Sequence, residues 1–158
     1  MRIQEMSALQ VVIAGGTTNP ADEALKGDLK SSGCMISHRY IDNISELYKM
    51  ADLYVFPVKD NGDKLPLYYN QVGAIDLPLS VMEAMACNLP VITFPFGALS
   101  RLFRSGDGLF FCDTEEEIIH LVQHLSYKYE IATRDKVLPY DWSKVIKRLE
   151  KIYQEIVL

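Results

Sequence analysis

The chain has 158 residues, of which 49% are hydrophobic and 23% charged, and its formal net charge is -5. This length and composition predict one globular domain with a buried core, and the acidic balance argues against a protein that binds along nucleic-acid phosphates. The three cysteines show no spacing of a disulfide framework, so we expect a cytoplasmic protein. No apolar run approaches the roughly 18 residues of a bilayer-spanning helix, so we expect no segment that spans a membrane, with peripheral attachment to a membrane surface left open.

Five short runs rich in β-branched and aromatic residues predict strands. They are residues 10–16, 34–38, 52–58, 90–96 and 108–113. Amphipathic or apolar segments between them predict helices. These helices cover Pro20 to about Ser32, Ile44 to Ala51, the segment from about Pro78, the segment after Thr114 and the segment after Asp141.

Local signals mark the starts of three of these helices. Asn19 and Pro20 are a good N-cap and first-turn pair. Thr114 followed by Glu117 is a capping box, and Asp141 precedes the last helix, whose apolar residues fall on one side. The alternation of strands and helices predicts a doubly wound α/β fold with a mainly parallel five-stranded sheet and helices on both faces.

The segment from Lys59 to Leu77 is long for a connection between a strand and a helix, so we expect it to be functional or mobile. It directly precedes the helix that carries Glu83. In open α/β sheets, ligands bind at the carboxyl ends of the strands, where helix N-termini offer free N–H groups to an anion. The start of the helix that follows this segment is therefore a candidate ligand-binding position.

Glu83 stands in that helix among Val81, Met82, Ala84 and Met85. A helix that is apolar nearly all round is predicted to be buried, and a buried carboxylate needs a hydrogen-bonding partner. Glu83 could cap backbone amides or pair with an internal arginine, or it could bind a polyol ligand. The pattern alone leaves these alternatives open.

Two other groups of residues could suggest metal or redox chemistry. Cys34, Cys87 and Cys112 are odd in number and show no C-x-x-C spacing, so they predict reduced thiols in or near the core. His120 and His124 have the i, i+4 spacing that a zinc site could use, but they face away from the apolar stripe of their helix. We expect solvent-exposed histidines and no metal site.

Four segments resemble consecutive motifs of one enzyme family. "ELYKMADLYVFPV", "LPLSVMEAMACNLPVITFPFGALSRLF", "GDGLFF" and "YDWSKVIKRLEKIY" are similar to the nucleotide-binding C-terminal domain of the group 1 (family 4) glycosyltransferases, which have the GT-B fold. The resemblance implies that residues 1–158 form a single donor-binding domain of a retaining glycosyltransferase. Such an enzyme moves a hexose from a UDP- or GDP-sugar to an acceptor hydroxyl and needs no bound metal or cofactor.

The resemblance also implies roles for residues around the helix of Glu83. Glu83 would be the second acid of the family's E-x7-E motif, which binds the ribose hydroxyls. The first acid would fall at Ile75, so the neighbouring Asp76 is the candidate catalytic carboxylate if the loop shifts by one residue. The usual glycines are replaced by "DLPLS", so backbone N–H groups of Leu79 and Ser80 would hold the diphosphate. A later glutamate of the family is replaced by Arg101.

By the same resemblance, the base of the nucleotide would lie against "HRYI", which contains Arg39 and Tyr40, and against the turn that contains Gly15 and Gly16. For Arg39 and Tyr40, the alternative is an ordinary solvated strand end. The acceptor would be a glycan or a lipid-linked molecule.

Parts of the family pattern are missing from the sequence. We find neither the N-terminal acceptor domain nor the strand that carries a glycine-arginine turn and a lysine for the diphosphate. We therefore expect the chain alone to be inactive, to need that domain in cis or in trans, and to self-associate through uncovered apolar surface. Without the central strand, the expected sheet order is 2-1-3-4-5. This is also the order of flavodoxin-like modules, so a regulatory or ligand-binding module without chemistry is the alternative.

Overall fold

A computed structural model describes residues 9–15, 20–59, 76–125 and 130–157. The chain divides into two compact units, Met1–Ile44 and Ser45–Leu158, which are described separately below. The described part contains no helix that is both long and apolar enough to cross a membrane.

The first unit contains two parallel strands and the helix that connects them. Strands β1 (Val12–Ala14) and β2 (Met35–Ser37) pair with Ile13 opposite Ile36. Helix α1 (Pro20–Ser31) has acidic residues in its first turn and Lys30 in its last turn, an arrangement that suits the helix dipole. Gly33 has a positive φ of 87°, and its N–H donates to the Lys30 carbonyl. A left-handed glycine thus ends the helix and directs the chain into β2.

The second unit contains a parallel sheet in the order β3-β4-β5. Its strands are β3 (Tyr54–Phe56), β4 (Val91–Thr93) and β5 (Leu109–Phe111). Every residue of the central strand β4 is buried, as expected for a parallel strand that is covered on both faces. The buried Thr93 hydroxyl donates to the Phe94 carbonyl at 2.9 Å, which satisfies its hydrogen-bonding requirement.

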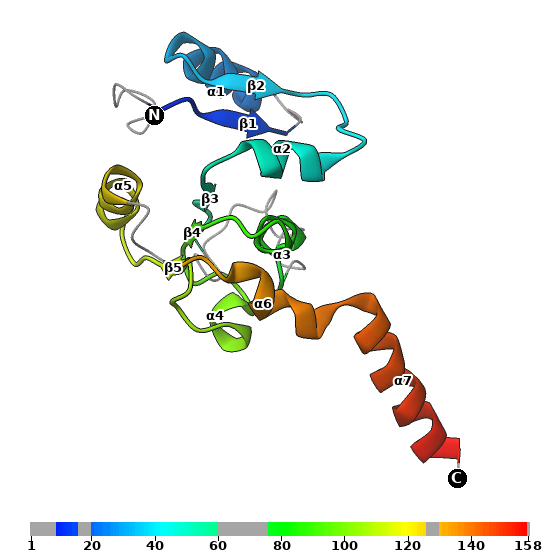
Figure 1. Ribbon diagram of the computed structural model, residues 1–158. Coiled ribbons are helices and arrows are strands. Elements are labelled where there is room, and N and C mark those ends of the chain that lie inside the picture. The colour runs from blue at the N-terminus through cyan, green and yellow to red at the C-terminus, as the bar shows by residue number, and fades with distance from the viewer. Residues whose placement is uncertain (1–8, 16–19, 60–75, 126–129, 158) are drawn as a thin grey trace. The chain divides into compact units, whose positions relative to one another are not determined.

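The other elements described in this unit are helices, and the last of them extends away from the sheet (Figure 1). They are α2 (Ile44–Met50), which begins at the end of the first unit, α3 (Leu79–Ala86), α4 (Leu99–Leu102), α5 (Glu115–His124), α6 (Thr133–Val137), the 3-10 helix η3 (Leu138–Tyr140) and α7 (Trp142–Val157). Helix α3 contacts β3 and β4, and α5 contacts β4. Helix α7 is amphipathic, but its apolar side chains, including Leu149, Ile152 and Ile156, are exposed.

The predicted helix starts are confirmed at α5 and α7. The Thr114 hydroxyl accepts from the Glu117 N–H at 3.2 Å, and the Glu117 carboxylate accepts from the Asp113 N–H at 2.7 Å. Asp141 accepts from the Ser143 N–H at 2.9 Å at the start of α7. The hydrogen bonds from the Ser143 hydroxyl and N–H hold the pKa of Asp141 below its ordinary value. The side chains of these capping residues therefore satisfy amides that a helix start leaves without partners.

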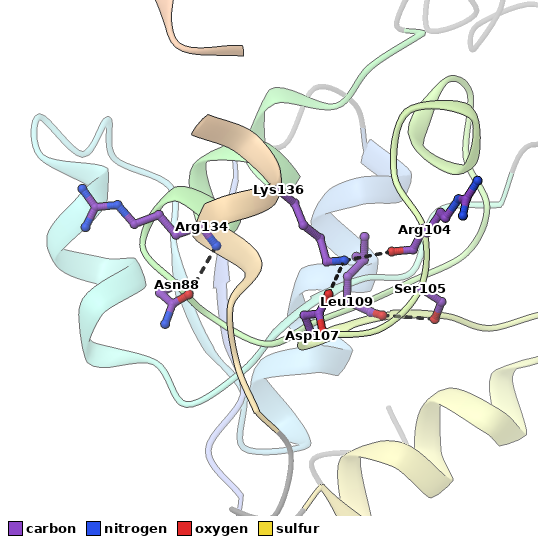
Figure 2. A network of polar contacts seen from close by, with 7 residues as sticks. All are labelled: Asn88, Arg104, Ser105, Asp107, Leu109, Arg134 and Lys136. Atoms are coloured by element: carbon purple, nitrogen blue, oxygen red, sulfur yellow. Dashed lines mark hydrogen bonds and ion pairs between the residues drawn. The ribbon is translucent and has the colours of Figure 1, made fainter. Parts of the chain in front are cut away.

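Polar contacts fasten α6 to the rest of the second unit (Figure 2). The Asn88 side chain accepts from the Arg134 N–H at 3.2 Å. The Lys136 ammonium lies 2.9 Å from the Asp107 carboxylate and donates to the Arg104 carbonyl at 3.3 Å. On the buried side of α6, the Thr133 hydroxyl donates to the Leu89 carbonyl at 2.8 Å. These contacts join α6 to the end of α3 and to the turn before β5.

The predicted five-stranded sheet is wrong, although all five strands form. The expected order 2-1-3-4-5 is interrupted between β1 and β3, and the described residues form a two-stranded sheet and a three-stranded sheet. A parallel strand is normally stabilised by cover on both faces, whereas Val12 and Ala14 of β1 are exposed. Of the segment from Lys59 to Leu77, residues 60–75 lie outside the described residues, so its predicted function or mobility stays a prediction.

Candidate functional site

The N-terminus of α3 lies beside the loop that follows β4. The Ala98 N–H donates to the Asp76 carbonyl at 2.6 Å. Gly97 has a positive φ of 51°, and a Cβ added to it would lie 2.2 Å from the same carbonyl oxygen. The chain before α3 is therefore in close backbone contact with the loop after β4. This contact puts the start of α3 near the carboxyl ends of the strands, where parallel α/β sheets bind ligands.

The first turn of α3 offers backbone donors. Pro78 is its N-cap, and a proline provides neither an N–H nor a side-chain cap. The N–H groups of Leu79 and Ser80 belong to the first turn, where a helix lacks carbonyl partners of its own. Leu79 is 68% exposed, and Ser80 is half-buried. Both amides are thus in a position that favours an anion.

Glu83 lies on the exposed face of α3, so the expectation that it is buried is wrong. Leu79, Glu83 and Ala86 are all exposed and recur at i, i+4 and i+7, whereas Val81, Ala84 and Met85 are buried. The polar face was not evident in the sequence because two of its three members are apolar. The helix therefore buries one side against the sheet and presents its carboxylate on the other.

Within the part of the chain that the structure describes, the Glu83 carboxylate is bound by a tyrosine, and neither a backbone amide nor an arginine contacts it. The Tyr48 hydroxyl on α2 donates to Glu83 Oε2 at 3.3 Å. The Tyr48 ring packs edge-on against Tyr54 of β3, with centroids 5.7 Å apart. Tyr54 in turn is hydrogen-bonded to the Ser80 side chain. We call Tyr48, Tyr54, Ser80 and Glu83 the tyrosine–glutamate cluster.

Both tyrosines of this cluster are neutral at neutral pH. Burial raises the pKa of Tyr48, and the nearby Tyr54 and Glu83 raise it further. Burial also raises the pKa of Tyr54, against the opposing effect of its hydrogen bond with Ser80. A neutral phenol can donate a hydrogen bond, which is the role that Tyr48 has toward Glu83. Neither tyrosine stands out in the sequence, because Tyr48 lies within a segment that predicts an ordinary helix and Tyr54 within a run that predicts an ordinary strand.

Asp76 and Arg101 form an ion pair near the start of α3. Arg101 Nη2 lies 2.9 Å from Asp76 Oδ1 and 2.8 Å from Oδ2. The two side chains are 67% and 68% exposed, so solvent screens the attraction. Asp76 is the neighbour of Ile75, where the resemblance places the first acid of the family motif, and Arg101 stands in place of a later glutamate of the family. The structure brings them together.

A second cation lies at the carboxyl ends of the strands. The Lys59 ammonium is 4.5 Å from the centroid of the Phe94 ring, within the range of a cation–π interaction. Lys59 follows β3, and Phe94 directly follows β4. Lys59 was given no individual role from the sequence, although it directly follows the strand predicted over residues 52–58 and opens the segment that was expected to be functional or mobile.

The remaining candidate residues belong to the first unit or lie outside the described residues. The Gly15 N–H donates to the Ser37 carbonyl at 3.0 Å and extends the pairing of β1 and β2. Arg39 is exposed, and Tyr40 is 88% exposed, which fits the solvated strand end that was the alternative for them. Gly16 lies outside the described residues. Asp76, Leu79, Ser80 and Glu83 are gathered in the second unit.

The histidines and cysteines do not form a further site among the described residues. The rings of His120 and His124 are exposed and stack with centroids 4.3 Å apart. No group of three metal-binding side chains occurs within the ranges that the structure covers. The thiols are free, with Cys34 and Cys112 buried and Cys87 half-buried, as predicted. Burial raises the pKa of Cys112 to about 11, which disfavours a reactive thiolate.

Comparison with known protein families places most of the chain within one family model. A family model described as "Glycosyl transferases group 1" matches residues 1–127, which include the tyrosine–glutamate cluster, Asp76 and Arg101. No curated protein matches the chain.

Proposed function

The chain belongs to the group 1 glycosyltransferases, and from this premise we propose that it is the donor-binding part of a retaining enzyme. In this proposal a hexose moves from a UDP- or GDP-sugar to the hydroxyl of a glycan or lipid-linked acceptor. The acceptor-binding domain is supplied in cis or in trans. The reaction takes place in the cytoplasm or at a membrane surface and uses no bound metal or cofactor.

The observation that carries this proposal is the exposed Glu83 carboxylate, one helical turn from the first-turn amides of α3. A carboxylate accepts hydrogen bonds from the adjacent hydroxyls of a ribose. The N–H groups of Leu79 and Ser80, with the positive end of the helix dipole, favour the phosphates. One face of one helix thus offers complementary groups to two neighbouring parts of a nucleoside diphosphate.

Other residues at the same edge are assigned supporting roles. The Lys59 ammonium would contribute positive charge toward the diphosphate, because the helix N-terminus alone supplies roughly half an elementary charge. Asp76 would contact the transferred sugar as the catalytic carboxylate, with Arg101 fixing its orientation through the ion pair.

Titration calorimetry with UDP, GDP and their hexose conjugates tests the proposal on the full chain. We expect binding, and we expect Glu83→Gln to weaken it about 10- to 100-fold, because a hydrogen bond to a charged group contributes roughly 1.5–3 kcal/mol. Glu150→Gln, at an exposed position of α7, is the matched control and should bind like the parent. Equal binding by the parent and Glu83→Gln would rule out the assigned role of Glu83.

A further inference from the structure

We infer that Tyr48 is a positioning residue, whose hydroxyl holds the Glu83 carboxylate in the orientation that receives the ribose of the donor. Glu83 Oε2 accepts from Tyr48, so Oε1 is the oxygen that we assign to the ligand. This inference rests on the proposed function of the site and adds a residue that the family motif does not contain.

The two side chains have contrasting surroundings. Glu83 is exposed and has three rotatable side-chain bonds, so by itself it would sample many orientations. Tyr48 is only 8% exposed, and its ring is held edge-on against Tyr54. A hydrogen bond from a fixed donor restricts a mobile acceptor. The carboxylate is therefore partly ordered before a ligand arrives, which lowers the entropy cost of binding.

The local structure explains why Tyr48 is the residue that orients the Glu83 carboxylate. Tyr48 lies near the end of α2, and Tyr54 lies in β3, with only a short connection between them. Glu83 is 35 positions away in sequence from Tyr48. A phenol is protonated at neutral pH even with its ordinary pKa, and burial raises the pKa of Tyr48 further, so the hydroxyl is available as a donor under the conditions of binding. The bond crosses from α2 to the exposed face of α3.

Tyr48→Phe tests this inference because it removes the hydroxyl and keeps the ring. The hydrogen bond is 3.3 Å long, which is longer than the usual O–H···O distance, so we expect a modest effect. The affinity of the full chain for UDP or GDP, whichever binds the parent, should fall about 2- to 5-fold. Tyr140→Phe removes a hydroxyl from a ring that packs on Phe103 and should bind like the parent.

A double-mutant cycle separates positioning from a general structural effect. If Tyr48 acts through Glu83, adding Tyr48→Phe to Glu83→Ala should change the nucleotide affinity no further. Tyr48→Phe should also reduce the preference of the protein for the nucleotide over its 2′,3′-dideoxy analogue, because the affected contact is to the ribose hydroxyls.

The outcomes distinguish the inference from the proposed function. If Tyr48→Phe binds the nucleotide as tightly as the parent does while Glu83→Ala binds it more weakly, the inference is overturned and the proposed function stays in place. An equal loss from Tyr48→Phe in the parent and in the Glu83→Ala background would also overturn it, because the tyrosine would then act elsewhere. If the parent binds neither UDP nor GDP, the proposed function fails and the inference fails with it.

Discussion

Arg101 of α4 holds both carboxylate oxygens of Asp76 through one guanidinium nitrogen, at 2.8 and 2.9 Å. The two residues are 25 positions apart in sequence. Asp76 lies just before α3, and Arg101 lies after β4, so the pair connects the same two segments as the backbone contact between Asp76 and Ala98. Side-chain and backbone interactions thus act together to hold the chain that leads into α3.

The ion pair should contribute little to stability. We expect Arg101→Met to lower the free energy of unfolding by less than about 1 kcal/mol, because both side chains are mainly exposed. Urea unfolding measures this change, with Arg104→Met at another exposed arginine as the control. If Arg101→Met lowers the free energy of unfolding far more than Arg104→Met does, by as much as the loss of a buried ion pair would, the conclusion that solvent screens the interaction is contradicted.

The backbone contact should be far more sensitive to substitution. Gly97→Ala places a Cβ against the Asp76 carbonyl at a residue that also has a positive φ. Gly106→Ala is the matched control, since Gly106 has a positive φ of 115° but open space around its Cα. We expect Gly106→Ala to cost roughly 1–2 kcal/mol. Gly97→Ala should cost about 1–3 kcal/mol more, because the carbonyl must move.

Thermal or urea unfolding of the two glycine variants compares these costs. Similar costs for the two variants would mean that the loop after β4 is not packed against the residues before α3. The position of the helix N-terminus at the carboxyl ends of the strands would then lose its main support.

Lys59 can be tested separately from Glu83. We expect Lys59→Met to weaken binding of UDP or GDP about 3- to 10-fold, and the loss to shrink at high salt, because an exposed cation acts through a screened charge. The matched control is Lys147→Met on α7. Binding of the corresponding nucleoside should be unaffected, since it carries no phosphate. An equal loss for nucleoside and nucleotide would contradict a role toward the diphosphate.

Local features of the structure were predictable from the sequence, and nonlocal ones were not. The five strands were evident as short apolar runs, and the capping box at Thr114 and the acid at Asp141 marked the starts of α5 and α7. The sheet order depends on pairings between distant segments, which no local pattern specifies. The short helix α6, Thr133–Val137, was missed because five residues are too few to show a helical period.

The candidate site was predicted in part. The position of Glu83 in a helix that begins after Pro78 was correct, but its burial was not, because Leu79 and Ala86 made the exposed face look apolar. Its contact with Tyr48 joins residues 35 positions apart, and that of Asp76 with Arg101 joins residues 25 positions apart. Such contacts depend on how the helices pack, which the sequence pattern does not reveal.

The central claim is that Glu83 binds the ribose hydroxyls of a nucleotide, and the most direct test compares each nucleotide with its 2′,3′-dideoxy analogue. Calorimetry on the parent should show UDP or GDP binding more tightly than the analogue, by about 10-fold or more if a charge-assisted hydrogen bond is lost. For Glu83→Ala, the two ligands should bind with nearly equal affinity, because the carboxylate that distinguishes them is gone. If Glu83→Ala keeps the full preference for the ribonucleotide, Glu83 does not contact the ribose and the account is wrong.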